Sequence, residues 1–112
     1  MKLFLKLLFA AIFLVMLWIN VKAANSIGLL ADIPRFASDP WAVATLYDAY
    51  CGFITFYCWV VFRERGWVAR IVWFVLIMAL GNIAMSLYVL TQLFRLKESE
   101  PVSTLFQPKA AA

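Results

Sequence analysis

The fold class is decided by residues 41–94, WAVATLYDAYCGFITFYCWVVFRERGWVARIVWFVLIMALGNIAMSLYVLTQLF. Two apolar runs, about 41–62 and 67–94, surround a short polar turn, RERG, at 63–66. Each run reaches the ~20 residues that a helix needs to cross a bilayer. The glycine of the turn permits a tight reversal. The pattern therefore predicts two transmembrane helices that pack as a tight antiparallel hairpin.

A further apolar run, about 3–21, lies at the N-terminus, and Lys2 and Lys6 mark its start. It has the length of a transmembrane helix, but Val21-Lys22-Ala23 also resembles the cleavage site of a secretory signal. We expect the helix to be retained in the mature chain. The sequence then predicts an all-α membrane protein with three transmembrane helices in one domain, 1–96, followed by an exposed, disordered tail, 97–112.

The composition argues against an ordinary soluble domain. Of the 112 residues, 66% are hydrophobic and 14% are charged, against roughly 25% charged in soluble domains. The chain has no histidine, and Cys51 and Cys58 lie seven residues apart within one apolar run. We therefore expect no metal and no cofactor. The net charge of +4 indicates contact with anionic lipid rather than with nucleic acid.

The charges near the turn predict the orientation. In a three-span arrangement the lysines and arginines divide five against five between the two sides. The positive-inside rule is most reliable for short loops, and Arg63, Arg65 and Arg70 crowd the shortest one. We therefore expect these arginines to contact anionic lipid at the cytoplasmic face of a bacterial inner membrane. The N-terminus and the 63–66 turn then lie inside, and the C-terminus lies outside.

The candidate functional site is a set of polar residues within the two apolar runs. The turn centres near Arg65, which places Asp48 and Asn82 at the same depth, each seventeen residues from the centre. A carboxyl in the membrane without a nearby cation is expected to be neutral and to contact the amide, directly or through one water. The residues expected around this pair are Thr45, Ser86, Tyr47 and Tyr50.

Four short motifs resemble those of a known family: Asp39-Pro40-Trp41, Tyr47-Asp48-Ala49-Tyr50, Arg63-Glu64-Arg65 and Gly81-Asn82. Through them, residues 39–96, with a looser match over the first apolar run, resemble an uncharacterised family of small bacterial integral membrane proteins, classed as a domain of unknown function. This resemblance implies a membrane location and a topology, and it implies no activity. Asp48 and the preceding Asp-Pro also resemble small membrane proteins of carotenoid metabolism.

Two interpretations of the candidate site stay open. Asp48 and Asn82 either hold the hairpin together, worth ~0.6–2 kcal/mol, or mark a proton, ion or ligand site in the membrane. We expect a non-enzymatic helix-bundle or accessory subunit, within a homo-oligomer or a larger membrane complex in the lipid bilayer. The alternatives are an oligomeric proton, ion or small-molecule transport unit around Asp48, and a lipid or isoprenoid enzyme of carotenoid type.

Overall fold

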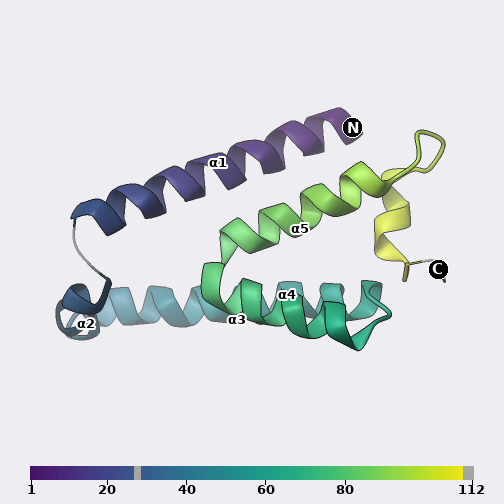
Figure 1. The fold of residues 1–112 in the computed structure, drawn as a ribbon. Coiled ribbons are helices and arrows are strands. Elements are labelled where there is room, and N and C mark those ends of the chain that lie inside the picture. Colours follow the sequence, from purple (N-terminus) through teal and green to yellow (C-terminus); the bar gives the residue numbers. More distant parts are fainter. Residues whose placement is uncertain (27–28, 110–112) are drawn as a thin grey trace.

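The computed structural model describes residues 1–26 and 29–109, with side chains outside 26–32. This part of the chain forms five α-helices and one short 3-10 helix. Figure 1 shows how the helices are arranged. They are α1 (Lys2–Ser26), α2 (Leu29–Ala37), α3 (Pro40–Arg63), α4 (Trp67–Leu80), α5 (Asn82–Arg95) and η1 (Val102–Phe106). The prediction of an all-α protein is confirmed over these residues, among which no strand occurs.

The helix α3 begins where the sequence supplies a cap. The Asp39 side chain accepts a hydrogen bond from the Trp41 amide at 3.0 Å. Pro40, which has no N–H to satisfy, occupies the first helical position. The 24 residues of α3 extend ~36 Å at about 1.5 Å per residue. Within the described residues, α3 and α1 are the two helices long and apolar enough to cross a membrane.

Gly81 breaks the helix predicted over 67–94. The chain leaves α4 after Leu80 and enters α5 at Asn82, and Gly81 between them has φ 59° and ψ −123°, a conformation that favours glycine. A Cβ here would lie 2.7 Å from Cζ of Phe53. With 14 residues each, α4 and α5 fall short of the ~20 that cross a bilayer. The structure therefore does not confirm a third transmembrane helix.

The break reverses the chain, so α5 doubles back on α4 and packs antiparallel against α1 (Figure 1). The Lys2 ammonium donates to the Lys97 carbonyl at 2.7 Å, and the Lys109 amide donates to the Arg63 carbonyl at 2.9 Å. The N-terminus, the 63–66 turn and the C-terminal segment thus share one end of the molecule, called the turn end below. The expected placement of the turn and the C-terminus on opposite sides is wrong, because α5 returns to the level of the turn.

The C-terminal segment packs on the helices instead of forming the exposed tail that the sequence predicts. Leu105 of η1 is only 5% exposed. Its carbonyl accepts a hydrogen bond from Nε1 of Trp59 at 2.9 Å. This segment therefore covers the turn end of α3 and α5; residues 110–112 of the predicted tail lie outside the described residues.

The core lies where α3, α4 and α5 meet, and Tyr88 is at its centre. This ring is fully buried, and it meets the rings of Trp73, Trp59 and Phe56 edge-on at centroid distances of 4.8, 5.4 and 6.0 Å. Edge-to-face contacts of this kind add to the gain from burial alone. Outside the core, many large apolar side chains of α1 and α3 are exposed. A bilayer would cover such a surface.

Candidate functional site

Two tyrosines of α3 confirm the register predicted for the hairpin. The Tyr50 hydroxyl donates to the Met78 carbonyl at 3.1 Å, and the Tyr57 hydroxyl donates to the Arg70 carbonyl at 2.8 Å. Both contacts join α3 to α4 at the levels expected for a turn centred near Arg65. The register therefore follows from the position of the turn.

Asp48 and Asn82 do not form the direct contact that the register predicted. Both side chains are exposed, and in the described structure no hydrogen bond joins them. The predicted register assumed that Asn82 lies inside one long helix. In the structure Asn82 is the first residue of α5, so the direction of its side chain depends on the break at Gly81. The direct form of the expected contact is absent from the described structure. Contact through one water, and the role of either residue in a functional site, stay predictions.

The other predicted members of this site place their hydroxyls elsewhere. Thr45 Oγ1 donates to the Trp41 carbonyl at 2.8 Å, and Ser86 Oγ donates to the Asn82 carbonyl at 2.7 Å. Such bonds satisfy a hydroxyl within its own helix. Tyr47 is 70% exposed. Tyr47 and Tyr50 line one small pocket with Leu46, and Asp48, Asn82, Thr45 and Ser86 are not among its lining residues.

Tyr50 instead satisfies a carbonyl that the break leaves open. In an unbroken helix the Met78 carbonyl would accept from the amide four residues later, but the chain turns away at Gly81. The Tyr50 hydroxyl replaces that donor. Its ring also meets the Phe53 ring at 5.0 Å, and Phe53 occupies the space that a Cβ on Gly81 would need. Tyr50 and Phe53 thus pack α3 against the break between α4 and α5.

A second group of polar residues is buried at the turn end. We call it the turn-end cluster: Arg63, Glu64, Tyr88, Gln92 and Lys109. The first four are each at most 6% exposed. Buried polar groups are unfavourable unless hydrogen bonds or ion pairs satisfy them. In the described structure, no buried side-chain nitrogen or oxygen lacks a partner, so the cluster is a completed network.

Arg63 joins α5 to the C-terminal segment. Its Nε donates to Oε1 of Gln92 at 2.6 Å. Its Nη1 donates to the carbonyls of Thr104 at 3.3 Å and Gln107 at 2.9 Å. A guanidinium group offers five donors in a fixed plane, which suits several acceptors at once. This inward position differs from the lipid contact that the sequence predicted for Arg63.

Glu64 is the acidic member of the cluster. Its Oε1 accepts from the Tyr88 hydroxyl at 3.2 Å and pairs with the Lys109 ammonium. Its backbone carbonyl accepts from Nε of Arg70 at 3.0 Å. The carboxylate is almost completely buried, so its nearby cation offsets part of the cost of desolvation. The cluster thus binds the turn, α5 and the end of the described chain together.

The sequence reasoning missed this cluster because it assigned the charges of the turn to solvent and lipid. Gln92 was the available signal, since an amide within an apolar run needs a hydrogen-bond partner. The partner Lys109 lies 45 residues from Glu64. Nothing in the local pattern predicts that contact.

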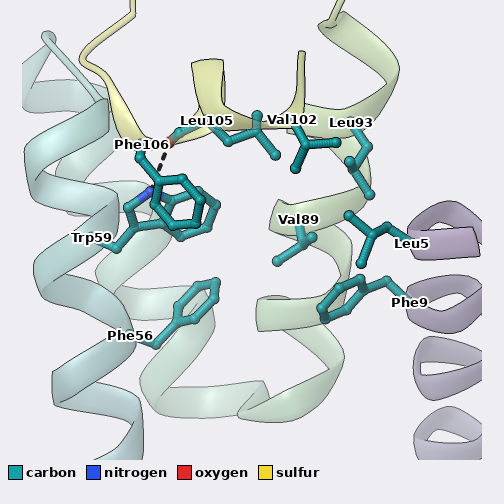
Figure 2. A pocket seen from close by; sticks show the side chains of 9 residues that line it. All are labelled: Leu5, Phe9, Phe56, Trp59, Val89, Leu93, Val102, Leu105 and Phe106. Carbon is teal, nitrogen blue, oxygen red and sulfur yellow. Dashed lines mark hydrogen bonds between the residues drawn. The ribbon is translucent and has the colours of Figure 1, made fainter. Parts of the chain in front are cut away.

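An apolar groove of about 270 Å³ lies between α1, α3 and α5 (Figure 2). In Figure 2, α3 and α1 stand on opposite sides of it, α5 lies behind it, and η1 closes it at the turn end. Its lining side chains are Leu5, Phe9, Phe56, Trp59, Val89, Leu93, Val102, Leu105 and Phe106. This set, called the apolar groove below, presents hydrocarbon and aromatic surface.

A basic pocket of about 450 Å³ lies at the same end. Its charged residues are Arg63, Arg95, Lys97, Lys109 and Glu100. η1 contributes Thr104 to the basic pocket and Leu105 to the apolar groove, so the two sites share this short helix. The turn end therefore combines an apolar site with an excess of positive charge.

The described residues offer no cluster of three metal-ligating side chains. Cys51 and Cys58 are both free and exposed. The chemistry that this part of the chain does present is that of cations, hydrogen-bond donors and an apolar groove.

Over the residues that the structure describes, the chain is all-helical, and two of its helices are long and apolar enough to cross a membrane. The chain belongs to the family described as "Protein of unknown function (DUF1475)", whose family model matches residues 3–107. The resemblance to an uncharacterised family is confirmed, including its looser match over α1, and it extends further to the C-terminal segment. No curated protein and no solved structure matches the chain.

Proposed function

We propose that this chain is an integral membrane protein in which α1 and α3 span the bilayer and α4 and α5 form a re-entrant hairpin. The two long helices match the ~30 Å hydrocarbon core. The shorter pair enters from the turn end, reverses at Gly81 and returns to the same face. Each half of the hairpin is ~21 Å long at about 1.5 Å per residue. The reversal therefore falls inside the bilayer.

The distribution of lysines and arginines between the two ends of the molecule supports two membrane-spanning helices rather than three. In this arrangement only Lys22 and Arg35 lie at the end opposite the turn. The other eight of the ten lysines and arginines lie at the turn end: Lys2, Lys6, Arg63, Arg65, Arg70, Arg95, Lys97 and Lys109. Such an excess is typical of a cytoplasmic face. The turn end, including the C-terminal segment, is therefore assigned to the cytoplasm.

The function that this arrangement supports best is that of a non-enzymatic subunit of a membrane assembly. The observation that carries it is the uncapped start of α5 at the break, where Gly81 is buried but the next residue is exposed. The first amides of α5 have no acceptor within their own helix, no side chain caps them, and Asn82 is exposed. Inside a bilayer, irregular backbone is tolerated only where protein or a water-filled cavity covers it. A second copy or another subunit would supply that cover.

Asp48 supports the same proposal. It lies ~12 Å along α3 from Pro40, at about 1.5 Å per residue, and its side chain is exposed. A carboxylate facing lipid at the bilayer centre costs up to ~2.5–3.5 kcal/mol on the insertion scale. A polar partner from a neighbouring subunit removes that cost. The polar site predicted within the hairpin is therefore proposed to form between subunits.

Native electrophoresis in a mild detergent, combined with cross-linking in membranes, tests the assembly. The wild-type chain is expected to migrate as an oligomer or a larger complex. Asp48→Leu is expected to shift it toward monomer, whereas Asp48→Asn keeps a hydrogen-bonding group and preserves the assembly. A wild-type chain that is monomeric by both methods would refute the proposal.

The same break favours one alternative, an oligomeric proton or ion transport unit around Asp48. Discontinuous helices whose ends meet inside the bilayer line the substrate sites of several transporters. A flux assay in liposomes separates this alternative from a purely structural subunit. Transport predicts flux with the wild type and none with Asp48→Asn, although both assemble; no flux with either chain rejects it.

A further inference from the structure

We propose that the apolar groove binds one acyl chain of an anionic phospholipid, with the lipid phosphate held by Arg95 and Lys97 of the basic pocket. This inference rests on the proposed membrane location of α1 and α3. It assigns a ligand class to the turn end, whereas the proposed assembly concerns the opposite end of the re-entrant hairpin.

The shape and chemistry of the groove suit a single chain. All nine lining side chains are apolar or aromatic, and the indole N–H of Trp59 is already donated to the Leu105 carbonyl (Figure 2). The volume of about 270 Å³ falls below the ~300–1,000 Å³ that encloses a drug-sized ligand. The groove therefore accommodates part of an acyl chain, and the remainder of the lipid stays in the bilayer between α1 and α3.

Lys2 links the groove to the basic pocket. It lies on the same face of α1 as Leu5 and Phe9, which line the groove, because these positions follow the helical repeat. The Lys2 ammonium donates to the carbonyls of Lys97 and Glu98 at 2.7 and 3.2 Å. Lys97 lines the basic pocket. The α1 wall of the groove thus ends beside the cations that would meet a headgroup.

The charges of the basic pocket complement a phosphate. Four cations and one carboxylate line it. Two of the cations serve the turn-end cluster, since Arg63 bonds Gln92 and Lys109 pairs with Glu64. Arg95 and Lys97 have exposed side chains and are the two that face a ligand. Charge-assisted hydrogen bonds to phosphate are among the strongest polar contacts that proteins make.

Native mass spectrometry of the full chain released from nanodiscs tests this inference. The nanodiscs contain equal amounts of phosphatidylcholine and phosphatidylglycerol. The wild-type chain is expected to retain one phosphatidylglycerol in preference to phosphatidylcholine. Equal retention of the two lipids, or a dimer that carries no lipid, would overturn the proposal; the dimer would show that a second copy fills the groove.

Two pairs of variants locate the site. Leu5→Trp fills the groove and is expected to abolish retention, whereas Leu3→Trp, on an exposed face of the same helix turn, leaves it unchanged. The double change Arg95→Gln and Lys97→Gln is expected to lower the preference for phosphatidylglycerol about tenfold or more, at about 1 kcal/mol per cation. Arg65→Gln, an exposed cation outside the pocket, should have a smaller effect.

Each outcome of the variants decides the proposal. If Leu5→Trp fails to fold, the charge variants still test the headgroup contact. Equal loss with Arg65→Gln and with the double variant would show that general surface charge, and not this pocket, attracts the lipid. Failure of the chain to enter nanodiscs would refute the membrane location itself, whereas entry without selective retention refutes only the lipid site.

Discussion

The polar groups at the two ends of the α4–α5 hairpin differ: those at one end are buried and hydrogen-bonded, and those at the other are exposed. At the turn end, Arg63 and Glu64 are buried, and each has partners within the chain. At the opposite end, called the tip, the chain reverses at Gly81, and Asn82 is exposed beside amides that no side chain caps. Asp48 is exposed on α3 at about the same depth in the hairpin. The completed network at the turn end holds the fold together. In the proposed assembly, the polar surface at the tip is where a second copy or another subunit would make contact.

The largest effect on stability is expected from Gly81→Ala at the tip. Alanine is strained at φ 59°, and its Cβ would collide with Phe53. Strain and overpacking together predict a loss of about 2–5 kcal/mol in the free energy of unfolding. Denaturation of the purified chain in mixed micelles measures it. Gly52→Ala is the matched control, because nothing lies within 4 Å of its added Cβ.

If Gly81→Ala and Gly52→Ala have equal effects, the reversal at Gly81 is not part of the fold. A continuous helix over 67–94 would then be the better description. The comparison of the two ends would lose its basis, since the tip would no longer exist as a separate region.

A smaller effect is expected from Lys109→Met at the turn end. The change leaves the buried Glu64 carboxylate without its cation, and hydrogen bonds to charged groups are worth about 1.5–3 kcal/mol. The same unfolding measurement applies, with Arg65→Met as the control because Arg65 is exposed and lies outside the basic pocket. Equal stability of the two variants would show that the turn-end cluster does not hold the C-terminal segment.

Tyr50→Phe is expected to have the smallest effect on stability. It removes the hydroxyl that serves the open carbonyl of Met78, and a neutral hydrogen bond is worth about 1 kcal/mol. Tyr47→Phe is the control, because Tyr47 is 70% exposed. A loss that is no greater with Tyr50→Phe than with the control would mean that water or another subunit serves the Met78 carbonyl instead.

The sequence predicts the helical class and the register of α3 on α4, because both depend on local features. The apolar run over 41–62 demands a helix, and the short turn at 63–66 fixes which residues of the two helices lie opposite each other. The contact between Tyr50 and Met78 follows directly from that turn. The cap of α3 by Asp39 likewise follows from neighbouring residues.

The reversal at Gly81 is harder to predict, because a glycine within an apolar run is also compatible with a continuous helix. Two features of the sequence did point to it. The run 67–94 is ~42 Å long as one helix at about 1.5 Å per residue, longer than the hydrocarbon core. The five-against-five division of charge also gave no clear orientation. Once α5 turns back, Arg95, Lys97 and Lys109 join the turn end, and the division becomes eight against two.

The most direct test of this account is the sidedness of three single cysteines, introduced after Cys51 and Cys58 are replaced by alanine. The positions are Gly66 in the turn, Ser103 in η1 and Ala23 near the far end of α1, and a membrane-impermeant thiol reagent is applied from either side. The account predicts that Gly66→Cys and Ser103→Cys react from the same, cytoplasmic side, and that Ala23→Cys reacts from the other. Labelling of positions 66 and 103 from opposite sides would contradict the re-entrant hairpin and restore three spans.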